Sequence, residues 1–114
     1  MLGGIERNSM TRGQRNKSQR RQAVEAAVEH FIEKPLRLSD RQTREVLWDL
    51  CVDLGYCLHS EQHAQVESER PTNPKDFAEL VMRLEGVGIG DSEMYSKVLE
   101  RVLSAFERAK ADVA

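Results

Sequence analysis

The sequence of 114 residues has little of several residue types that stabilise or mark small domains. It contains only two cysteines and three prolines, and its aromatic side chains are three Phe, two Tyr and one Trp. Two cysteines exclude a framework of several disulfides, so a reducing cytoplasm is the expected compartment. Because aromatic side chains are scarce, the core must consist mainly of Leu, Val and Ala.

Long hydrophobic runs are also lacking. No stretch approaches the roughly 20 apolar residues that a membrane-spanning helix needs. The segment after Arg20 and Arg21 is interrupted by glutamates, unlike the apolar region of a signal peptide. We therefore expect a bacterial protein that stays in the cytoplasm and has no membrane partner.

Charge is unevenly distributed along the chain. Residues 1–22 carry six basic side chains and one acidic side chain, a net charge of +5. The remaining residues carry 11 basic and 18 acidic side chains, a net charge of −7. Residues 1–17 contain almost no periodic apolar positions and are predicted to form a disordered basic arm. Residues 18–112 are predicted to form a single helical domain.

Helical periodicity predicts an all-α fold, a compact bundle of four principal helices. The first should begin near Ser18 and end before Pro35, since the residue preceding a proline is disfavoured in a helix. The third should begin at the N-cap Asn73 and end at Gly86, and the last should begin at the N-cap Asp91. Residues 56–73 are predicted to be a long loop with one short, exposed helical turn.

The second helix, between residues 39 and 55, is the most informative stretch. Ser39 and Gln42 have the spacing of a capping box, and Gly55 can adopt the left-handed conformation that ends a helix. One apolar stripe consists of Val46, Leu47, Leu50, Cys51 and Leu54.

Trp48 and Val52 lie four residues apart on another side of the same helix. A helix that is apolar on two sides is either enclosed within the monomer or covered by a partner. Trp beside Arg is the composition that dominates binding hot spots. The predicted partner-binding residues are therefore Arg41, Arg44, Trp48 and Val52, and the partner is another protein chain or a second copy in a homodimer.

Cys51, Cys57, His59 and His63 form the one cluster that suggests metal or thiol chemistry. The cysteine spacing does not match the usual zinc pattern, and Cys51 falls on a core stripe. We therefore expect a buried structural cysteine, exposed histidines, no metal and no cofactor. A small metal-dependent or thiol-dependent enzyme using Cys57, His59 and His63 is a further alternative to a non-enzymatic binding module.

Nucleic-acid binding is the main alternative that charge supports. A basic arm attracts phosphates without reading sequence. A helix-turn-helix with a recognition helix near residues 58–70 is disfavoured, because its glutamates would face the DNA. The residues predicted to contact nucleic acid are Arg12, Arg15, Lys17, Arg20 and Arg21.

Overall fold

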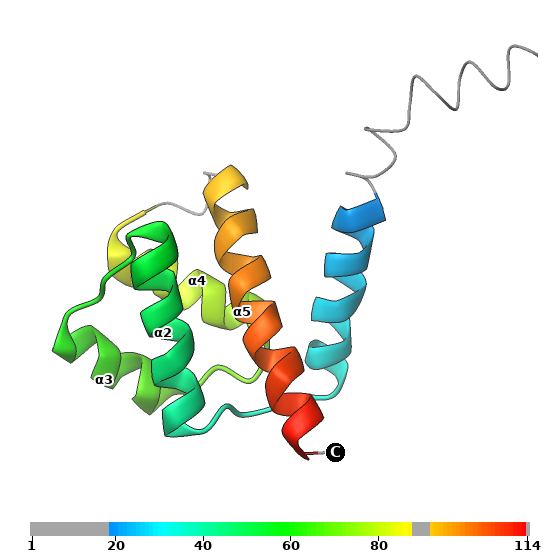
Figure 1. The fold of residues 1–114 in the computed structure, drawn as a ribbon, viewed down its shortest axis with the longest axis horizontal. Coiled ribbons are helices and arrows are strands. Elements are labelled where there is room, and N and C mark those ends of the chain that lie inside the picture. The colour runs from blue at the N-terminus through cyan, green and yellow to red at the C-terminus, as the bar shows by residue number, and fades with distance from the viewer. Residues whose placement is uncertain (1–18, 88–91, 114) are drawn as a thin grey trace, which may run out of the picture.

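The computed structural model describes residues 19–87 and 92–113. Within these ranges the chain has helices joined by short connections and no strand, which confirms the all-α class (Figure 1). The first helix covers residues 19–33 and is followed by α2 (Asp40–Leu54), α3 (Ser60–Glu69), α4 (Pro74–Glu85) and α5 (Ser92–Val113). The predicted arm at residues 1–17 and the predicted N-cap Asp91 lie outside the described residues.

The boundaries of α2 follow from its end residues, as the sequence predicts. The Ser39 side chain accepts a hydrogen bond from the backbone N–H of Gln42 at 3.1 Å, and Gln42 Oε1 accepts one from the backbone N–H of Ser39 at 2.9 Å. Gly55 has φ of 78° and ends the helix in the left-handed region. Both ends of α2 are therefore encoded locally.

The boundaries of α4 are equally local. Asn73 Oδ1 accepts a hydrogen bond from the backbone N–H of Asp76 at 2.9 Å, and Pro74 occupies the start of the helix, where a missing N–H costs nothing. Gly86 has φ of 82° at the C-terminal end. The predicted start and end of this helix are confirmed.

The prediction of a long loop over residues 56–73 is wrong, because α3 occupies ten of these residues. The described part of the chain thus has five helices and not four. Contacts that are distant in sequence stabilise α3. Val66 is fully buried, and the guanidinium of Arg70 pairs with Asp40 at the start of α2. Few apolar residues mark α3 in the sequence, so periodicity alone could not reveal it.

Gln62 connects α3 to α4 through its side-chain amide. Its Oε1 accepts a hydrogen bond from the backbone N–H of His59 at 2.8 Å, and its Nε2 donates to the carbonyl of Leu84 at 2.7 Å. Leu84 lies in the last turn of α4, where carbonyls have no partner within their own helix. The Gln62 side chain therefore provides a hydrogen-bond partner at two helix ends, the N-terminus of α3 and the C-terminus of α4.

We expect Gln62→Ala to lower the free energy of unfolding by about 1–2 kcal/mol, since both helix ends lose a partner. Urea denaturation followed by circular dichroism measures this loss. Gln65→Ala is the matched control, because Gln65 is exposed and its side-chain amide donates to Glu69 of the same helix at 2.9 Å. Equal effects of the two substitutions would show that the Leu84 contact contributes nothing.

The core lies around α5, which packs against both α2 and α4, while α3 packs against α2 and α4. Three phenylalanines from three helices meet in this core. The ring centroids of Phe106 and Phe31 are 5.5 Å apart, those of Phe106 and Phe77 are 6.1 Å apart, and both pairs are edge-to-face. All three phenylalanines of the chain thus lie where helices converge.

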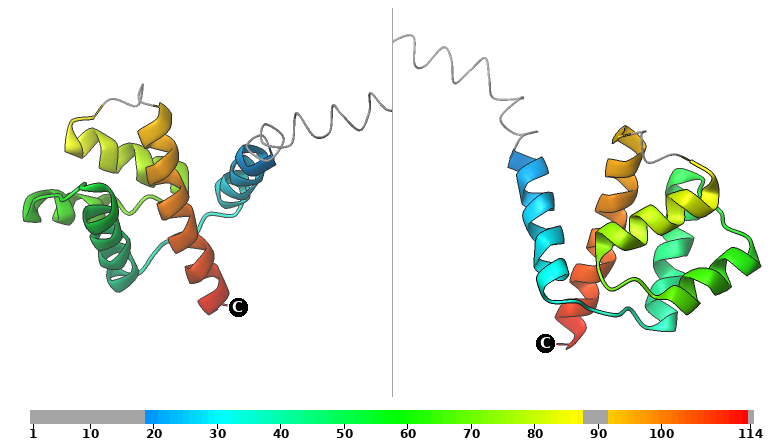
Figure 2. Two further views of the ribbon diagram at one scale, coloured as in Figure 1. Left: turned by 45° about the horizontal axis from the view of Figure 1, so that its top comes forward. Right: turned by 180° about the vertical axis from the view of Figure 1, so that it is seen from behind.

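The first helix lies beside α5 (Figures 1 and 2), and its Phe31 ring contacts Phe106 of α5. Val28 and Phe31 are buried, whereas Ile32 is exposed. Leu38 in the following connection is buried, and Leu36 packs against the core.

Burial raises the pKa of the Tyr95 phenol, and the carboxylates of Glu79 and Asp76 raise it further. Tyr95 is in the first turns of α5, and both carboxylates are on α4. The raised pKa favours the neutral phenol in the folded state, so the contribution of Tyr95 to the free energy of unfolding is lost as the pH rises through the alkaline range.

None of the described helices is long and apolar enough to cross a membrane.

Candidate functional site

Trp48 and Val52 are exposed on α2, with 66% and 60% of their surface accessible to solvent. The opposite side of this helix is buried through Val46, Leu47 and Leu50. Neither the first helix nor the segment between α2 and α4 covers Trp48 within the chain. A large aromatic side chain beside an exposed valine is an unusual surface for a small domain.

An open depression of about 490 Å³ surrounds Trp48. Two of the predicted partner-binding residues, Arg41 and Arg44, line it together with the indole. Val52 lies one turn further along α2 and extends the apolar surface beyond the depression. We give the name tryptophan surface to the residues that line the depression together with Val52, namely Arg41, Arg44, Glu45, Trp48, Asp49, Val52 and Arg108.

Arg108 of α5 was not predicted to belong to this surface. The sequence places it near the end of the last helix, where its charge also suits the helix dipole. In the structure it lines the depression and pairs with Asp49 at 3.8 Å. Arg108 lies near Trp48 only because of the way α2 crosses α5. The periodicity of a single helix therefore cannot predict that Arg108 belongs to this surface.

Ion pairs border the tryptophan surface on both sides. On the α3 side, Arg44 pairs with Glu67 at 3.3 Å. On the α5 side, Asp53 pairs with Arg101 at 3.3 Å. The surface therefore presents both signs of charge close to the apolar residues. Such exposed pairs contribute little stability and can exchange partners at small cost.

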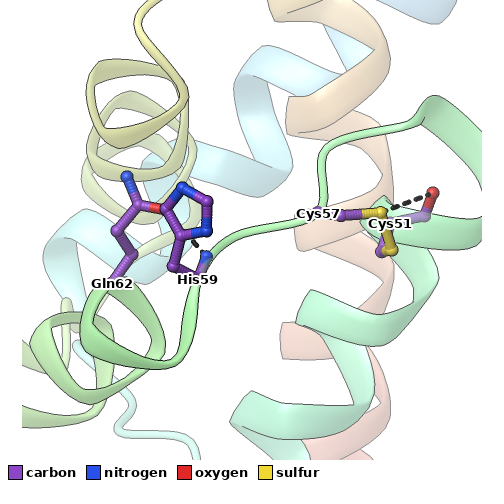
Figure 3. The surroundings of a disulfide bond; sticks show 4 residues. All are labelled: Cys51, Cys57, His59 and Gln62. Carbon is purple, nitrogen blue, oxygen red and sulfur yellow. Dashed lines mark hydrogen bonds between the residues drawn. A yellow bond between two sulfur atoms is a disulfide. The ribbon is translucent and has the colours of Figure 1, made fainter.

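The structure overturns the prediction of a buried structural cysteine. Cys51 is only half-buried, and a disulfide joins it to Cys57 (Figure 3). His59 is the N-cap residue of α3 and His63 lies one turn later. Among the described residues no group of three or more potential ligands is placed to hold a metal ion.

The predicted nucleic-acid residues divide between two parts of the chain. Arg12, Arg15 and Lys17 lie outside the described residues. Arg20 and Arg21 are exposed on the first helix, and Arg20 pairs with Glu100 of α5 at 3.4 Å. The described structure therefore brings one of these cations to an acidic residue of the domain.

The fold and the tryptophan surface define a small helical domain with an exposed aromatic face. Comparisons with protein-family models, curated proteins and solved structures find no match to this chain. A functional assignment must therefore come from the surface itself.

Proposed function

We propose that this protein is a non-enzymatic interaction module of the bacterial cytoplasm that binds another protein chain, in the first instance a second copy of itself, through the tryptophan surface. The observation that supports the proposal is the exposure of Trp48 beside Val52 on a helix whose other side is buried. Burying an exposed indole against a partner removes apolar area from water and favours association.

Charge balance favours a second copy as the partner. Four ion pairs border the exposed side of α2, namely Arg41–Glu45, Arg44–Glu67, Asp49–Arg108 and Asp53–Arg101. In a two-fold dimer the same surface meets itself, so it must be complementary to its own charges. Over these four pairs the numbers of positive and negative side chains are equal, so the exposed side of α2 with its border meets its copy without net repulsion, unlike a uniformly basic surface.

Light scattering on the full chain tests this proposal. We expect the mass to rise from 13.0 kDa towards twice that value as the concentration increases. Trp48→Asp should weaken association by roughly 30-fold or more, the effect of losing a hot-spot residue worth about 2 kcal/mol.

The matched control is Ile32→Asp, which introduces the same charge at an exposed apolar residue of the first helix. It should leave association unchanged. A wild-type chain that remains monomeric at millimolar concentration would contradict self-association. Equal weakening by both substitutions would show that Trp48 has no special role.

Nucleic-acid binding is the second candidate, and the net charge of +5 on residues 1–22 favours it. Electrostatic binding by such a segment weakens steeply as salt increases. A gel shift at two salt concentrations, with the full chain and with a chain lacking residues 1–21, distinguishes the two functions. Equal and negligible retention of both chains would eliminate this candidate.

A further inference from the structure

The Cys51–Cys57 pair lies at the surface where α2 ends. Cys51 is in the last turn of α2, and Cys57 is exposed in the connection to α3 (Figure 3). Their Cα atoms are 4.3 Å apart. Neither residue belongs to the buried hydrophobic core. Breaking the bond between them therefore exposes no core side chain.

The main chain brings these two residues together independently of the bond. Gly55 reverses the chain, and its N–H donates to the carbonyl of Cys51 at 3.0 Å. The N–H of Tyr56 donates to the carbonyl of Leu50 at 3.1 Å, and the Tyr56 side chain is buried. This left-handed cap directs Cys57 back over Cys51. The two sulfurs therefore stay close after reduction.

The reduced pair also has a hydrogen bond available. Cys57 Sγ lies 3.6 Å from the carbonyl oxygen of Cys51, so its thiol can donate to that oxygen. A carbonyl in the last turn of a helix can accept such a bond without disturbing the helix. Both the dithiol and the disulfide thus fit the same backbone.

From this arrangement we propose that Cys51 and Cys57 form a reversible dithiol–disulfide pair that exchanges with low-molecular-weight disulfides and thiols while the domain stays folded. This proposal is independent of the tryptophan surface. It also accommodates a disulfide in a reducing compartment, where such bonds are transient.

The exchange proceeds in two steps. The thiolate of the exposed Cys57 attacks one sulfur of a small disulfide, forming a mixed disulfide and releasing one thiolate. The thiolate of Cys51 then attacks the Cys57 sulfur, which forms the internal bond and releases the second thiolate. The protein loses two electrons and two protons, and the small disulfide is reduced to two thiols.

The experiment uses the full chain in mixtures of reduced and oxidised glutathione, followed by acid quenching, alkylation and intact mass measurement. We expect a single transition between a form with two alkylated thiols and a form with none. The same ratio of the two forms should be reached whether the chain starts reduced or oxidised. Glutathione adducts should remain below roughly a tenth of the protein, because the second step is intramolecular. Circular dichroism should show the same helix content in both forms.

Cys51→Ser is the diagnostic variant, because it keeps the exposed Cys57 and removes the second thiol. It should accumulate a stable glutathione adduct while remaining folded. Cys57→Ser leaves only the half-buried Cys51, and we expect it to react at least about fivefold more slowly.

Three results would overturn the proposal. The bond could resist excess reduced glutathione until denaturant is added, which would make it a structural disulfide. The reduced wild-type chain could lose its helix content. Glutathione adducts could also accumulate on the wild type to the same extent as on Cys51→Ser.

Discussion

Phe106→Ala is expected to lower the free energy of unfolding by about 3–5 kcal/mol. Phe106 is fully buried and contacts the rings of Phe31 and Phe77 edge-to-face. Removing its ring creates a cavity where the first helix, α4 and α5 converge. Domains of this size are stable by only about 5–15 kcal/mol, so the variant should lose a large part of its total stability.

Urea denaturation followed by far-ultraviolet circular dichroism measures this change. Trp48→Ala, compared at a concentration at which the chains are monomeric, is the matched control, since it truncates an aromatic side chain that is 66% exposed. The control should change the free energy of unfolding by no more than about 0.5 kcal/mol. Similar losses for both variants would show that the Phe106 contacts do not stabilise the core.

Val66→Asp is expected to cost about 4 kcal/mol or more and to detach α3 from the domain. Val66 is fully buried and is the one residue of α3 with no exposed surface. A carboxylate at this position is fully buried, and the guanidinium of Arg70 one turn later already pairs with Asp40, so the new carboxylate must either stay protonated or reach water. Moving α3 away from α2 and α4 provides that access.

Hydrogen exchange of the α3 amides locates the loss, and thermal unfolding measures it. Ala64→Asp is the matched control, because Ala64 is exposed on the same helix and receives the same charge. It should leave exchange in α4 and α5 unchanged and cost less than about 1 kcal/mol. Full protection of α3 in Val66→Asp would refute the anchoring role of Val66.

The elements that the sequence predicts well are those encoded within one helix. The ends of α2 depend on Ser39, Gln42 and Gly55, which lie close together in the chain. The ends of α4 depend on Asn73, Pro74 and Gly86 in the same way. The apolar stripe with Val46, Leu47 and Leu50 then predicts correctly which side of α2 is buried.

The helix α3 could not be predicted from its local sequence, because the residues that stabilise it are distant in the chain. Gln62 bonds Leu84, 22 residues later, and Arg70 pairs with Asp40, 30 residues earlier. A local window contains neither partner. The composition of residues 60–69 favours a helix, but the segment has too few apolar residues for periodicity to predict that a helix packs there.

The candidate site was partly predictable for the same reason. Periodicity identifies Trp48 and Val52 as lying outside the core stripe of α2, but it cannot decide whether another element covers them. The structure leaves both exposed. Arg108 and the Cys51–Cys57 bond depend on how α2 meets α5 and on how the chain reverses at Gly55. The binding role of the tryptophan surface stays a prediction.

The position of the single tryptophan determines which optical signal reports on this protein. Because the indole of Trp48 is already in contact with water in the folded monomer, its emission changes little when the helices unfold. Denaturation curves recorded by intrinsic fluorescence would therefore have a small amplitude. The same indole is well placed to shift its emission to shorter wavelength when another molecule excludes water from it.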